Sequence, residues 1–532
     1  MTKHVLTMLL ALLVAVHAGP VRFERVGGEQ NGTAAAFEAW YRLEMERQGG
    51  PGQSHGWWPW GLRAFDFDGD GLPDLLASHH GLPHSMLLRG TRGPAGALTF
   101  TDVTRQLGLD YRDLPGADER PWVWDFDGDG HLDIVGISNE ATAGCAWNQA
   151  GRSFRATPGS LLKSLAHPQE VIDLDGDGFL DVDGGAKGQW FYVPATKTFR
   201  HDPQPRFPVP DGIAPEVLAP FETLQKTTRF FYVDYLTHDL VGFDTLGYDA
   251  RPIDLDGDGR RDVVVRGSGG YGAEYLARYL LRQPDGRLAD RTDVLGLPPA
   301  GAPILIRDLT GDGLPEILVV ANKAGEAAGG LFLNDGKGAF HRVDGPLSEF
   351  LDRRGPYLIR AYPADFDDDG RPDLVLSNPR LGVAVVYHNE GGGRFAEVLK
   401  LTECWDSNPI VIADFDGDGR TDLAIGIRAK GTPGEIQLFL NRTENAGHFL
   451  SIVPRMAAPN PFAVGAVIEV YPAGDLAKGA RPLFVEKAHL DATPVHAGLG
   501  VRTRCGVRVT FPGGKTVERN NQEVDRSLTI TP

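Results

Sequence analysis

The stretch Asp66-Phe-Asp68-Gly-Asp70-Gly-Leu72-Pro-Asp74 follows the pattern Asp-x-Asp-x-Asp-Gly-x-x-Asp, and relatives of it recur along this 532-residue chain. The six further copies begin at Asp125, Asp173, Asp254, Asp308, Asp365 and Asp414. We number the seven copies loops 1 to 7 in chain order. They hold 27 of the 48 Asp residues, and therefore explain why Asp outnumbers the 23 Glu residues. A repeat of this kind predicts an array of similar structural units.

Each position of the loop has a reason in the coordination chemistry of calcium, which takes six to eight oxygen ligands at roughly 2.3–2.6 Å. Positions one, three, five and nine supply side-chain oxygens, position seven supplies a backbone carbonyl, and Gly at position six permits a sharp turn through positive φ. The expected ligands of up to seven Ca²⁺ ions are Asp66, Asp68, Asp70, Leu72, Asp74, Asp125, Asp127, Asp129, His131, Asp133, Asp173, Asp175, Asp177, Phe179, Asp181, Asp254, Asp256, Asp258, Arg260, Asp262, Asp308, Thr310, Asp312, Leu314, Glu316, Asp365, Asp367, Asp369, Arg371, Asp373, Asp414, Asp416, Asp418, Arg420 and Asp422.

Loop 5 departs from the pattern at two of these positions. Thr310 replaces the third Asp, and Glu316 replaces the ninth. The loop therefore carries less negative charge than its relatives. We expect the site at Asp308 to bind calcium most weakly.

Other interpretations of the loops are weaker. A metal-free Asp-rich turn explains one isolated copy equally well, but two carboxylates about 4 Å apart repel by about 4 kcal/mol at an effective dielectric near 20, and this would recur seven times. Magnesium demands near-octahedral geometry, and a transition metal would want His or Cys, which the loops lack apart from His131, whose side chain is at a non-ligand position. An EF-hand loop ends in Glu at position twelve, where the first three loops have Ala77, Gly136 and Gly184.

Strand signals surround the loops. Apolar or β-branched runs follow them, as in Asp262-Val-Val-Val and Glu316-Ile-Leu-Val-Val, and position two is always Phe or Leu. Each loop is therefore expected to join a hairpin, with position two in the core. Loop starts are 59, 48, 81, 54, 57 and 49 residues apart, close to one four-stranded blade. The sequence predicts an all-β fold: a seven-bladed β-propeller with calcium-binding hairpin loops, followed by a small C-terminal β domain.

Three further structural expectations follow. The segment Val21 to Val26 resembles the Phe-led last strands of other units, so we expect it to complete the seventh blade beside Ile436 to Leu440. Residues 34–48 are expected to form a short helix. The 81-residue step leaves room for an insertion between Gly184 and Ala250, in which Arg229 to Tyr235 is a candidate extra strand.

At this point a family resemblance can be stated. The loops and the turns after them, such as Asn334-Asp-Gly-Lys-Gly-Ala-Phe340, resemble FG-GAP/VCBS repeats, the blades of integrin-α-type propellers. The segments Asn460 to Val470, Val495 to Gly500 and Gly506 to Lys515 resemble the ASPIC/UnbV domain. The combination resembles the cartilage acidic protein 1 family. That resemblance implies a secreted, calcium-loaded propeller that acts in adhesion or interaction.

Composition and the termini set the expected location. Residues 1–18 read as a secretory signal peptide, with a basic start, a short apolar run and Ala18 before the cut. We divide the chain into this peptide, a propeller at 19–442 and an ASPIC/UnbV-like domain at 443–532. A secreted or periplasmic monomer with no membrane span is expected. The formal charge of −18 disfavours nucleic acid as a partner. Cys145, Cys404 and Cys505 are expected to be buried hydrophobic residues, although one pair could form.

Two functions remain open at this stage. The chain has no Gly-x-Ser-x-Gly elbow, phosphate-binding loop, His-Glu-x-x-His or Cys-x-x-Cys motif. The favoured hypothesis is therefore a non-catalytic interaction or adhesion platform for an extracellular protein or glycan. The alternative is a glycan-active enzyme, a polysaccharide lyase or glycosidase, in which the calcium loops are scaffolding around catalytic residues that the sequence does not locate.

Overall fold

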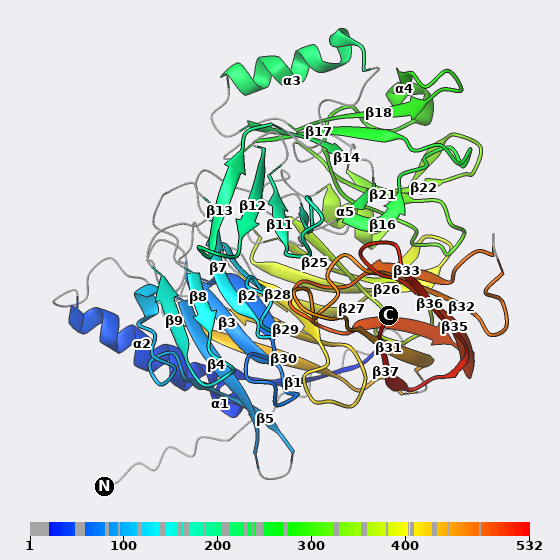
Figure 1. The fold of residues 1–532 in the computed structure, drawn as a ribbon. Coiled ribbons are helices and arrows are strands. Elements are labelled where there is room, and N and C mark those ends of the chain that lie inside the picture. Colours follow the sequence, from blue (N-terminus) through cyan, green and yellow to red (C-terminus); the bar gives the residue numbers. More distant parts are fainter. Residues whose placement is uncertain are drawn as a thin grey trace, which may run out of the picture.

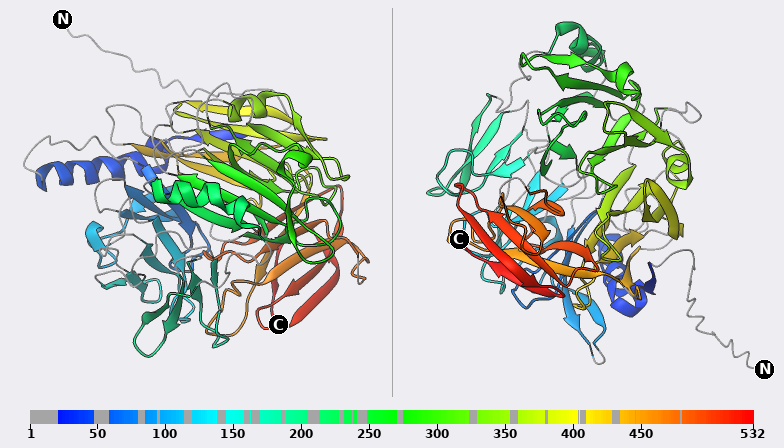
Figure 2. Two further views of the ribbon diagram at one scale, coloured as in Figure 1. Left: turned by 90° about the horizontal axis from the view of Figure 1, so that it is seen from above. Right: turned by 90° about the vertical axis from the view of Figure 1, so that its right-hand side faces the viewer.

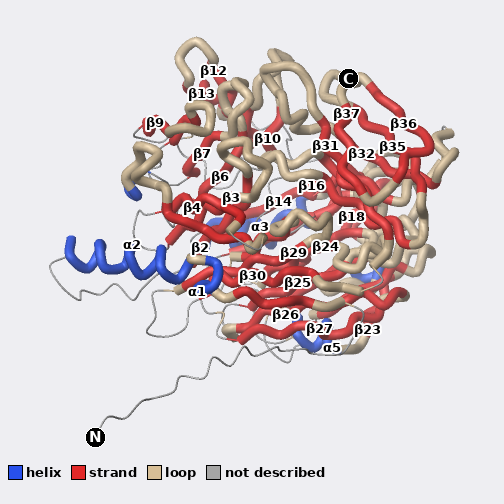
Figure 3. The backbone as a smooth tube through the Cα atoms, turned by 90° about the horizontal axis from the view of Figure 1, so that it is seen from below, coloured by secondary structure: helices blue, strands red, loops and turns tan. Residues whose placement is uncertain are grey.

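The computed structural model describes residues 21–47, 59–79, 85–93, 96–113, 120–137, 145–157, 162, 170–184, 188–204, 213–227, 231–236, 238–240, 248–269, 275–322, 329–352, 359–378, 381–402, 404, 409–427, 434–444, 446–477 and 480–532. The expected signal peptide lies outside these residues. Strands dominate the described chain, and α1 (Gly28–Asn31) and α2 (Thr33–Arg47) lie at one edge of it (Figure 3). The expected all-β fold is confirmed, as is the short helix near residue 34.

Sheets 1 to 3 each contain four consecutive antiparallel strands. In each, the loop joins the first two strands, as expected: Phe65 pairs with Asp74 across loop 1. The strands are β2 Pro59–Phe65, β3 Asp74–His79, β4 Ser85–Arg92 and β5 Leu98–Asp102 in sheet 1; β6 Arg120–Trp124, β7 Asp133–Ile137, β8 Cys145–Asn148 and β9 Phe154–Thr157 in sheet 2; and β10 Glu170–Ile172, β11 Asp181–Asp183, β12 Gln189–Val193 and β13 Thr198–Asp202 in sheet 3.

Sheets 4 and 5 take in the inserted segment. Sheet 4 has the order β14-β17-β18-β19, and sheet 5 the order β16-β15-β20-β21-β22-β23. The strands are β14 Phe231–Leu236, β15 His238–Leu240, β16 Tyr248–Pro252, β17 Val263–Gly269, β18 Leu276–Arg282, β19 Leu288–Asp290, β20 Ala302–Arg307, β21 Glu316–Val320, β22 Gly330–Asn334 and β23 Phe340–Val343. The expected extra strand near residue 231 is therefore present, as β14.

Loop 4 does not join a hairpin, and that expectation is wrong. β16 precedes the loop and belongs to sheet 5, whereas β17 follows it and belongs to sheet 4. The reason is competition for one strand edge: β14 from the insertion pairs with β17, placing Tyr235 opposite Val265, and leaves β16 to pair with β15. The base of the loop is still closed, because the N–H of Asp262 donates to the Ile253 carbonyl at 2.8 Å and the N–H of Leu255 donates to Asp262 Oδ2 at 2.7 Å.

Sheets 6 and 7 return to four strands. Sheet 6 is β24-β25-β26-β27, and sheet 7 is β1-β30-β29-β28. In sheet 7 the N-terminal strand β1 pairs with β30, placing Phe23 opposite Asn441 and Val26 opposite Leu438, so the expected closure by the N-terminus is confirmed. The strands are β24 Arg360–Ala364, β25 Asp373–Asn378, β26 Val383–Gly391, β27 Arg394–Thr402, β1 Phe23–Val26, β28 Ile410–Ala413, β29 Asp422–Ile427 and β30 Glu435–Asn441.

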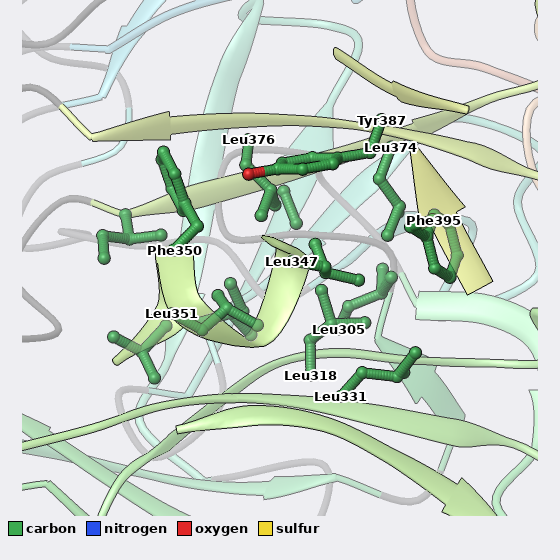
Figure 4. Packing of buried hydrophobic residues seen from close by; sticks show 14 of the residues in the cluster. Leu305, Leu318, Leu331, Leu347, Phe350, Leu351, Leu374, Leu376, Tyr387 and Phe395 are labelled. Carbon is green, nitrogen blue, oxygen red and sulfur yellow. The ribbon is translucent and has the colours of Figure 1, made fainter. Parts of the chain in front are cut away.

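Neighbouring sheets share their hydrophobic cores. Leu305 and Leu318 of sheet 5 pack in one cluster with Leu374 and Tyr387 of sheet 6 (Figure 4). Similar clusters join sheets 1 and 2, 2 and 3, 4 and 5, 6 and 7, and 7 and 1, the last with Phe37 of α2. Among the described residues, no such cluster joins sheets 3 and 4. The seven sheets thus follow one another in space as in sequence.

The C-terminal strands form two further sheets, one of three strands in the order β34-β31-β37 and one of four in the order β33-β32-β35-β36. They are β31 His448–Pro454, β32 Val467–Pro472, β33 Phe484–Lys487, β34 Val495–Gly500, β35 Arg504–Thr510, β36 Thr516–Glu523 and β37 Arg526–Ile530. They share one core and lie against the seven sheets, in red and orange in Figures 1 and 2. We call residues 446–532 the tail.

The remaining helices are short: η1 Tyr111–Asp113, α3 Pro215–Thr227, α4 Thr292–Leu295 and α5 Pro346–Leu351. No helix in the described ranges is long and apolar enough to cross a membrane. All three cysteines are buried, which confirms their expected role as small hydrophobic residues.

Candidate metal centres

All seven loops share three hydrogen bonds from backbone N–H groups to their own carboxylates. In loop 1, Gly71 donates to Asp66 Oδ2 at 2.9 Å, Leu72 donates to Asp70 Oδ1 at 2.8 Å, and Phe67 donates to Asp74 Oδ2 at 3.0 Å. The equivalent bonds in the other six loops measure 2.7 to 3.1 Å. One loop conformation is therefore built seven times, loop 5 with Glu316 included.

The conserved turn follows from the glycine at position six. Its φ lies between 81° and 93° in all seven loops, in the left-handed region that the pattern predicts. The Phe or Leu at position two is buried in every loop except loop 3, where Leu174 is half-buried. The loop is thus anchored in the core on one side while its carboxylates converge on the other.

The carboxylate at position nine is the most buried part of each loop, with at most 1% of the residue exposed. Burial, together with the neighbouring carboxylates, raises the pKa of Asp74, Glu316 and Asp422 to about 8. Backbone hydrogen bonds to these carboxylates lower the pKa and offset part of the rise. The same causes raise the pKa of Asp181 and Asp262 to about 6. A buried carboxylate that resists ionisation alone is stabilised when a cation compensates its charge.

Position three has a buried oxygen without a hydrogen-bond partner in four loops. Asp68 Oδ1, Asp127 Oδ1, Thr310 Oγ1 and Asp367 Oδ1 are buried and have no hydrogen-bond partner. These four atoms occupy the same position of four different loops. Buried polar atoms normally have partners, so a group absent from the protein chain fits this position. An oxygen-ligated divalent cation is such a group.

The structure brings the predicted ligands together. Groups of three ligand atoms within 4.8 Å of one another include Asp66, Asp68 and Asp70 in loop 1. In loops 2, 3 and 4 the group joins positions one, three and nine instead. A group in loop 6 includes a residue that the sequence did not single out, His388. His388 lies on β26, far from the loop in sequence, and no spacing signal marks it.

Loop 5 differs in the charges that face it. Asp308 Oδ2 lies 3.3 Å from Arg251 Nη1 and 3.5 Å from Arg481 Nη2, so two guanidinium groups flank the carboxylate at position one. Thr310 adds no charge at position three. Burial raises the pKa of Asp308, and the two arginines oppose that rise.

Loop 6 differs at position four, where the other loops have Gly and this one has Asp368. Asp368 keeps the left-handed turn, with φ of 56°, and is buried. Its Oδ1 lies 2.6 Å from His496 Nε2 on β34 of the tail. Loop 6 therefore carries five carboxylates and a direct bond to the tail.

The tail covers several loops. The N–H groups of Gly447 and Gly500 donate to the carbonyls of Asp367 and Asp368, each at 2.7 Å. Arg481 Nη2 donates to the Gly311 carbonyl of loop 5 at 3.1 Å. Close approaches of Pro459 to Gly128 (loop 2) and of Phe449 to Gly419 (loop 7) leave no room for side chains at those glycines, and Pro459 also lies close to Gly178 (loop 3). The tail is thus packed on the loop side of the sheets.

An asparagine that sequence reasoning quoted without a role links neighbouring sheets. Asn389 Nδ2 donates to the Leu309 carbonyl of loop 5 at 2.8 Å, and Asn441 Nδ2 donates to the Phe366 carbonyl of loop 6 at 2.7 Å. Asn148 and Asn334 make the same bond to loops 1 and 4. The recurrence of Asn before the glycine turn was the signal that could have revealed this link.

Comparison with protein families fits this architecture. A model of the FG-GAP-like repeat matches residues 125–182, 254–319, 308–376 and 365–425, and a model described as ASPIC and UnbV matches residues 456–532. The chain carries FG-GAP-like repeats and an ASPIC and UnbV domain. The repeats thus have a β-propeller-like all-β fold, and six of the seven loops fall within the matched ranges. Loop 1 lies outside them.

Individual relatives are more distant. The chain is similar to human cartilage acidic protein 1, with 26% identity over 177 residues that cover 30% of this chain and 25% of that protein. The mouse protein is 25% identical over 189 residues, covering 31% and 28%. The match thus spans about a quarter of the length of these curated relatives.

Among solved structures, similarity extends to an Agrocybe aegerita lectin described as recognising non-reducing terminal N-acetylglucosamine. Its TM-score is 0.35 and its identity 19%, with 72% of this chain and 85% of that one covered. A Lactobacillus plantarum protein has a TM-score of 0.29 and 11% identity, with 71% and 98% covered.

Proposed function

We propose that this protein is a secreted or periplasmic, calcium-loaded, seven-bladed β-propeller that serves as a non-catalytic interaction platform for an extracellular protein or glycan. The seven sheets would be the blades, residues 19–442 the propeller and residues 443–532 a separate small β domain. The protein would act as a monomer after removal of residues 1–18.

The observation that carries the proposal is the buried, unpartnered oxygen at position three of four loops, beside the buried carboxylate at position nine. Ca²⁺ would be held by side chains at positions one, three, five and nine and by the carbonyl at position seven. It would supply no redox chemistry and would neutralise converging carboxylates. Loop 5, with Thr310 and two facing arginines, would bind it most weakly.

In this proposal the ion stabilises the fold. Each loop closes against its neighbour through position two, whose carbonyl accepts the asparagine bond from the next sheet in four cases. An ion that fixes the loop therefore also fixes the contact between sheets. A rigid ring of this kind presents its connecting segments as a binding surface, which is how many scaffolds carry function.

The first experiment measures metal content and stability. Elemental analysis of tag-free protein should find several calcium ions per chain. A chelator should lower the melting temperature, and calcium should restore it better than magnesium. An unchanged melting temperature in demonstrably metal-free protein would refute the calcium part of the proposal.

The second experiment tests the platform. Purified protein is screened against glycan arrays and extracellular proteins, with calcium and with chelator. Calcium-dependent binding without turnover is the expected result. Cleavage of a polysaccharide by the purified chain would overturn the non-catalytic part and favour a glycan-active enzyme.

A further inference from the structure

The tail meets the seven sheets in two different ways. Near sheets 1 to 3 the contact is apolar: Val464 is 4% exposed and belongs to the core that joins sheets 2 and 3. Phe462 packs against that core and against the core between sheets 1 and 2. Among the described residues, the cores that join sheets 5 and 6 and sheets 6 and 7 include no residue of the tail. Apolar packing therefore fixes the tail to sheets 1 to 3.

At loop 6 the contact is made by the backbone instead. The N–H groups of Gly447 and Gly500 donate to the carbonyls of Asp367 and Asp368, each at 2.7 Å. Gly447 directly precedes β31, and Gly500 ends β34, so both donors lie at one end of the same tail sheet. We call these two hydrogen bonds the clasp. Polar contacts between two parts of a chain hold them less firmly than a shared apolar core, and leave relative motion possible.

Loop 6 is covered closely, and loop 1 is not. A Cβ added at Gly370 of loop 6 would lie 3.4 Å from the Gly498 carbonyl of the tail, and a Cβ at Gly498 would lie 1.9 Å from Asp365 Oδ2. In loop 1 a Cβ added at Gly69 or Gly71 meets no atom within 4 Å. The two loops share one backbone conformation, so loop 1 is a matched, uncovered reference for loop 6.

The clasp depends on the part of loop 6 that an ion would fix. Asp367 is at position three, so its carboxylate is an expected ligand and its carbonyl is a clasp acceptor. Loop 6 brings five carboxylates together, against which Arg371 sets one guanidinium, paired with the acid at position five. Without a bound cation these carboxylates repel one another, and the turn that aims the two carbonyls at the tail relaxes.

We propose that calcium in loop 6 closes the clasp. With the ion bound, the tail is held at loop 6; without it, this end of the tail lifts away while the apolar contacts at sheets 1 to 3 keep the tail attached. The inference rests on the proposed function, because it requires calcium in loop 6. It adds a regulated contact to that function: the tail uncovers the face of loop 6 when calcium is low. By linkage, a closed clasp also strengthens calcium binding in loop 6.

Hydrogen exchange of the full chain, with calcium and with chelator, tests the clasp directly. The amides of Gly447 and Gly500 should exchange at least roughly fivefold faster in chelator. The amides of Arg455 and Ala488, each of which donates to a carbonyl within the tail at 2.9 Å, should keep their exchange rates. Arg455 directly follows the other end of β31, so it reports whether the tail itself unfolds.

Variants assign the effect to loop 6. Asp369→Asn removes a ligand charge at position five of loop 6 and keeps the backbone of the clasp. In calcium that saturates wild type, it should speed exchange at Gly447 and Gly500 as the chelator does. Asp70→Asn, the same change at position five of loop 1, is the control and should leave both amides at the wild-type rate. Elemental analysis should show that each variant has lost one calcium, and Asp367→Asn serves as a second loop 6 variant.

The outcomes separate this inference from the proposed function. If the chelator lowers the melting temperature but leaves the exchange of Gly447 and Gly500 unchanged, the clasp is overturned and the proposed function stands. Equal acceleration at Arg455 and Ala488 would mean that the whole tail unfolds, and would also overturn the clasp. Equal acceleration in Asp70→Asn would remove the assignment to loop 6. A melting temperature that does not respond to metal removal would refute the calcium part of the proposed function itself.

Discussion

His496 Nε2 of the tail lies 2.6 Å from Asp368 Oδ1, at the one loop position where the chain replaces a left-handed glycine by an acid. Two residues 128 positions apart thus connect the acidic loops to the C-terminal sheets. The left-handed conformation costs a non-glycine residue about 1–2 kcal/mol. The contact with the tail offsets that cost.

Replacing Asp368 tests this relationship. Asp368→Gly relieves the backbone cost but removes a hydrogen bond to a charged group, worth about 1.5–3 kcal/mol, so we expect a net loss of about 1 kcal/mol of unfolding free energy. Urea denaturation measures it, and hydrogen exchange should show β34 opening more readily. Asp368→Asn, which tolerates the turn and can still bond His496, is the control. A glycine variant more stable than wild type would contradict the interpretation.

Gly498 tests how closely the tail sits on loop 6. A Cβ at this position would lie 1.9 Å from Asp365 Oδ2, at the first position of the loop. Gly498→Ala should therefore push the tail away from the loop, lower the melting temperature and weaken metal binding. Gly93→Ala, where a Cβ meets its nearest atom at 3.6 Å, is the control. Normal melting and metal content in Gly498→Ala would show that the tail can shift freely.

The asparagine links make a prediction about stability. Asn389→Ala leaves the Leu309 carbonyl, buried between sheets 5 and 6, without its donor. An unsatisfied buried group costs about 1–3 kcal/mol, and we expect a loss of that size in chemical denaturation. Lys337→Ala, on an exposed turn of sheet 5, should change little. An Asn389→Ala variant with the same unfolding free energy as wild type would mean that water replaces the amide as donor.

Arg481 should weaken calcium binding at loop 5. Its guanidinium lies 3.5 Å from Asp308 Oδ2, so removing its charge should strengthen the weakest calcium step in a titration. Arg481→Gln is the variant, and Arg287→Gln, at an 83% exposed side chain on sheet 4, is the charge-matched control. If the weakest calcium-binding step of Arg481→Gln equals that of wild type, the weakest site lies in another loop.

The tail junction should respond to pH through His489 and Glu486. Their side chains lie 3.1 Å apart, and Arg307 of sheet 5 lies 3.5 Å from Glu486. Burial alone would lower the pKa of His489, and the charge of Arg307 also lowers it. The negative charges of Glu486 and Asp491 outweigh both effects, so the pKa of His489 is raised. Burial alone would raise the pKa of Glu486, but His489 and Arg307 lower it.

The direction of each pKa shift sets the pH range in which the group stabilises the fold. A raised His489 pKa stabilises the fold fully below the ordinary value of 6.5, and this stabilisation is lost as pH rises through the raised value. The lowered pKa of Glu486 stabilises the fold above pH 4.5, and this stabilisation is lost as pH falls through the lowered value. The melting difference between wild type and His489→Gln should therefore be largest between these pH values and shrink above them. A difference that grows toward pH 8 would contradict this assignment.

Much of the fold could be predicted from local chemistry. A nine-residue loop with one glycine and alternating carboxylates is a nearly self-contained unit, so its conformation, its flanking strands and its repetition follow from the residues themselves. The closure of sheet 7 by β1 also followed, because the last unit lacked a Phe-led strand. At loop 4 the same reasoning failed, since β14 took the edge of β17.

The sequence by itself thus determined the class of fold and the conformation of the seven acidic loops. Only the tertiary structure decided which strand pairs with β17, that asparagines join neighbouring sheets, that the tail rests on the loops through Asp368 and His496, and that His388 lies beside the carboxylates of loop 6. The physical reason is the distance along the chain over which each interaction acts. Coordination geometry and strand pattern act over a few residues, whereas these contacts join segments that only the packed chain brings together.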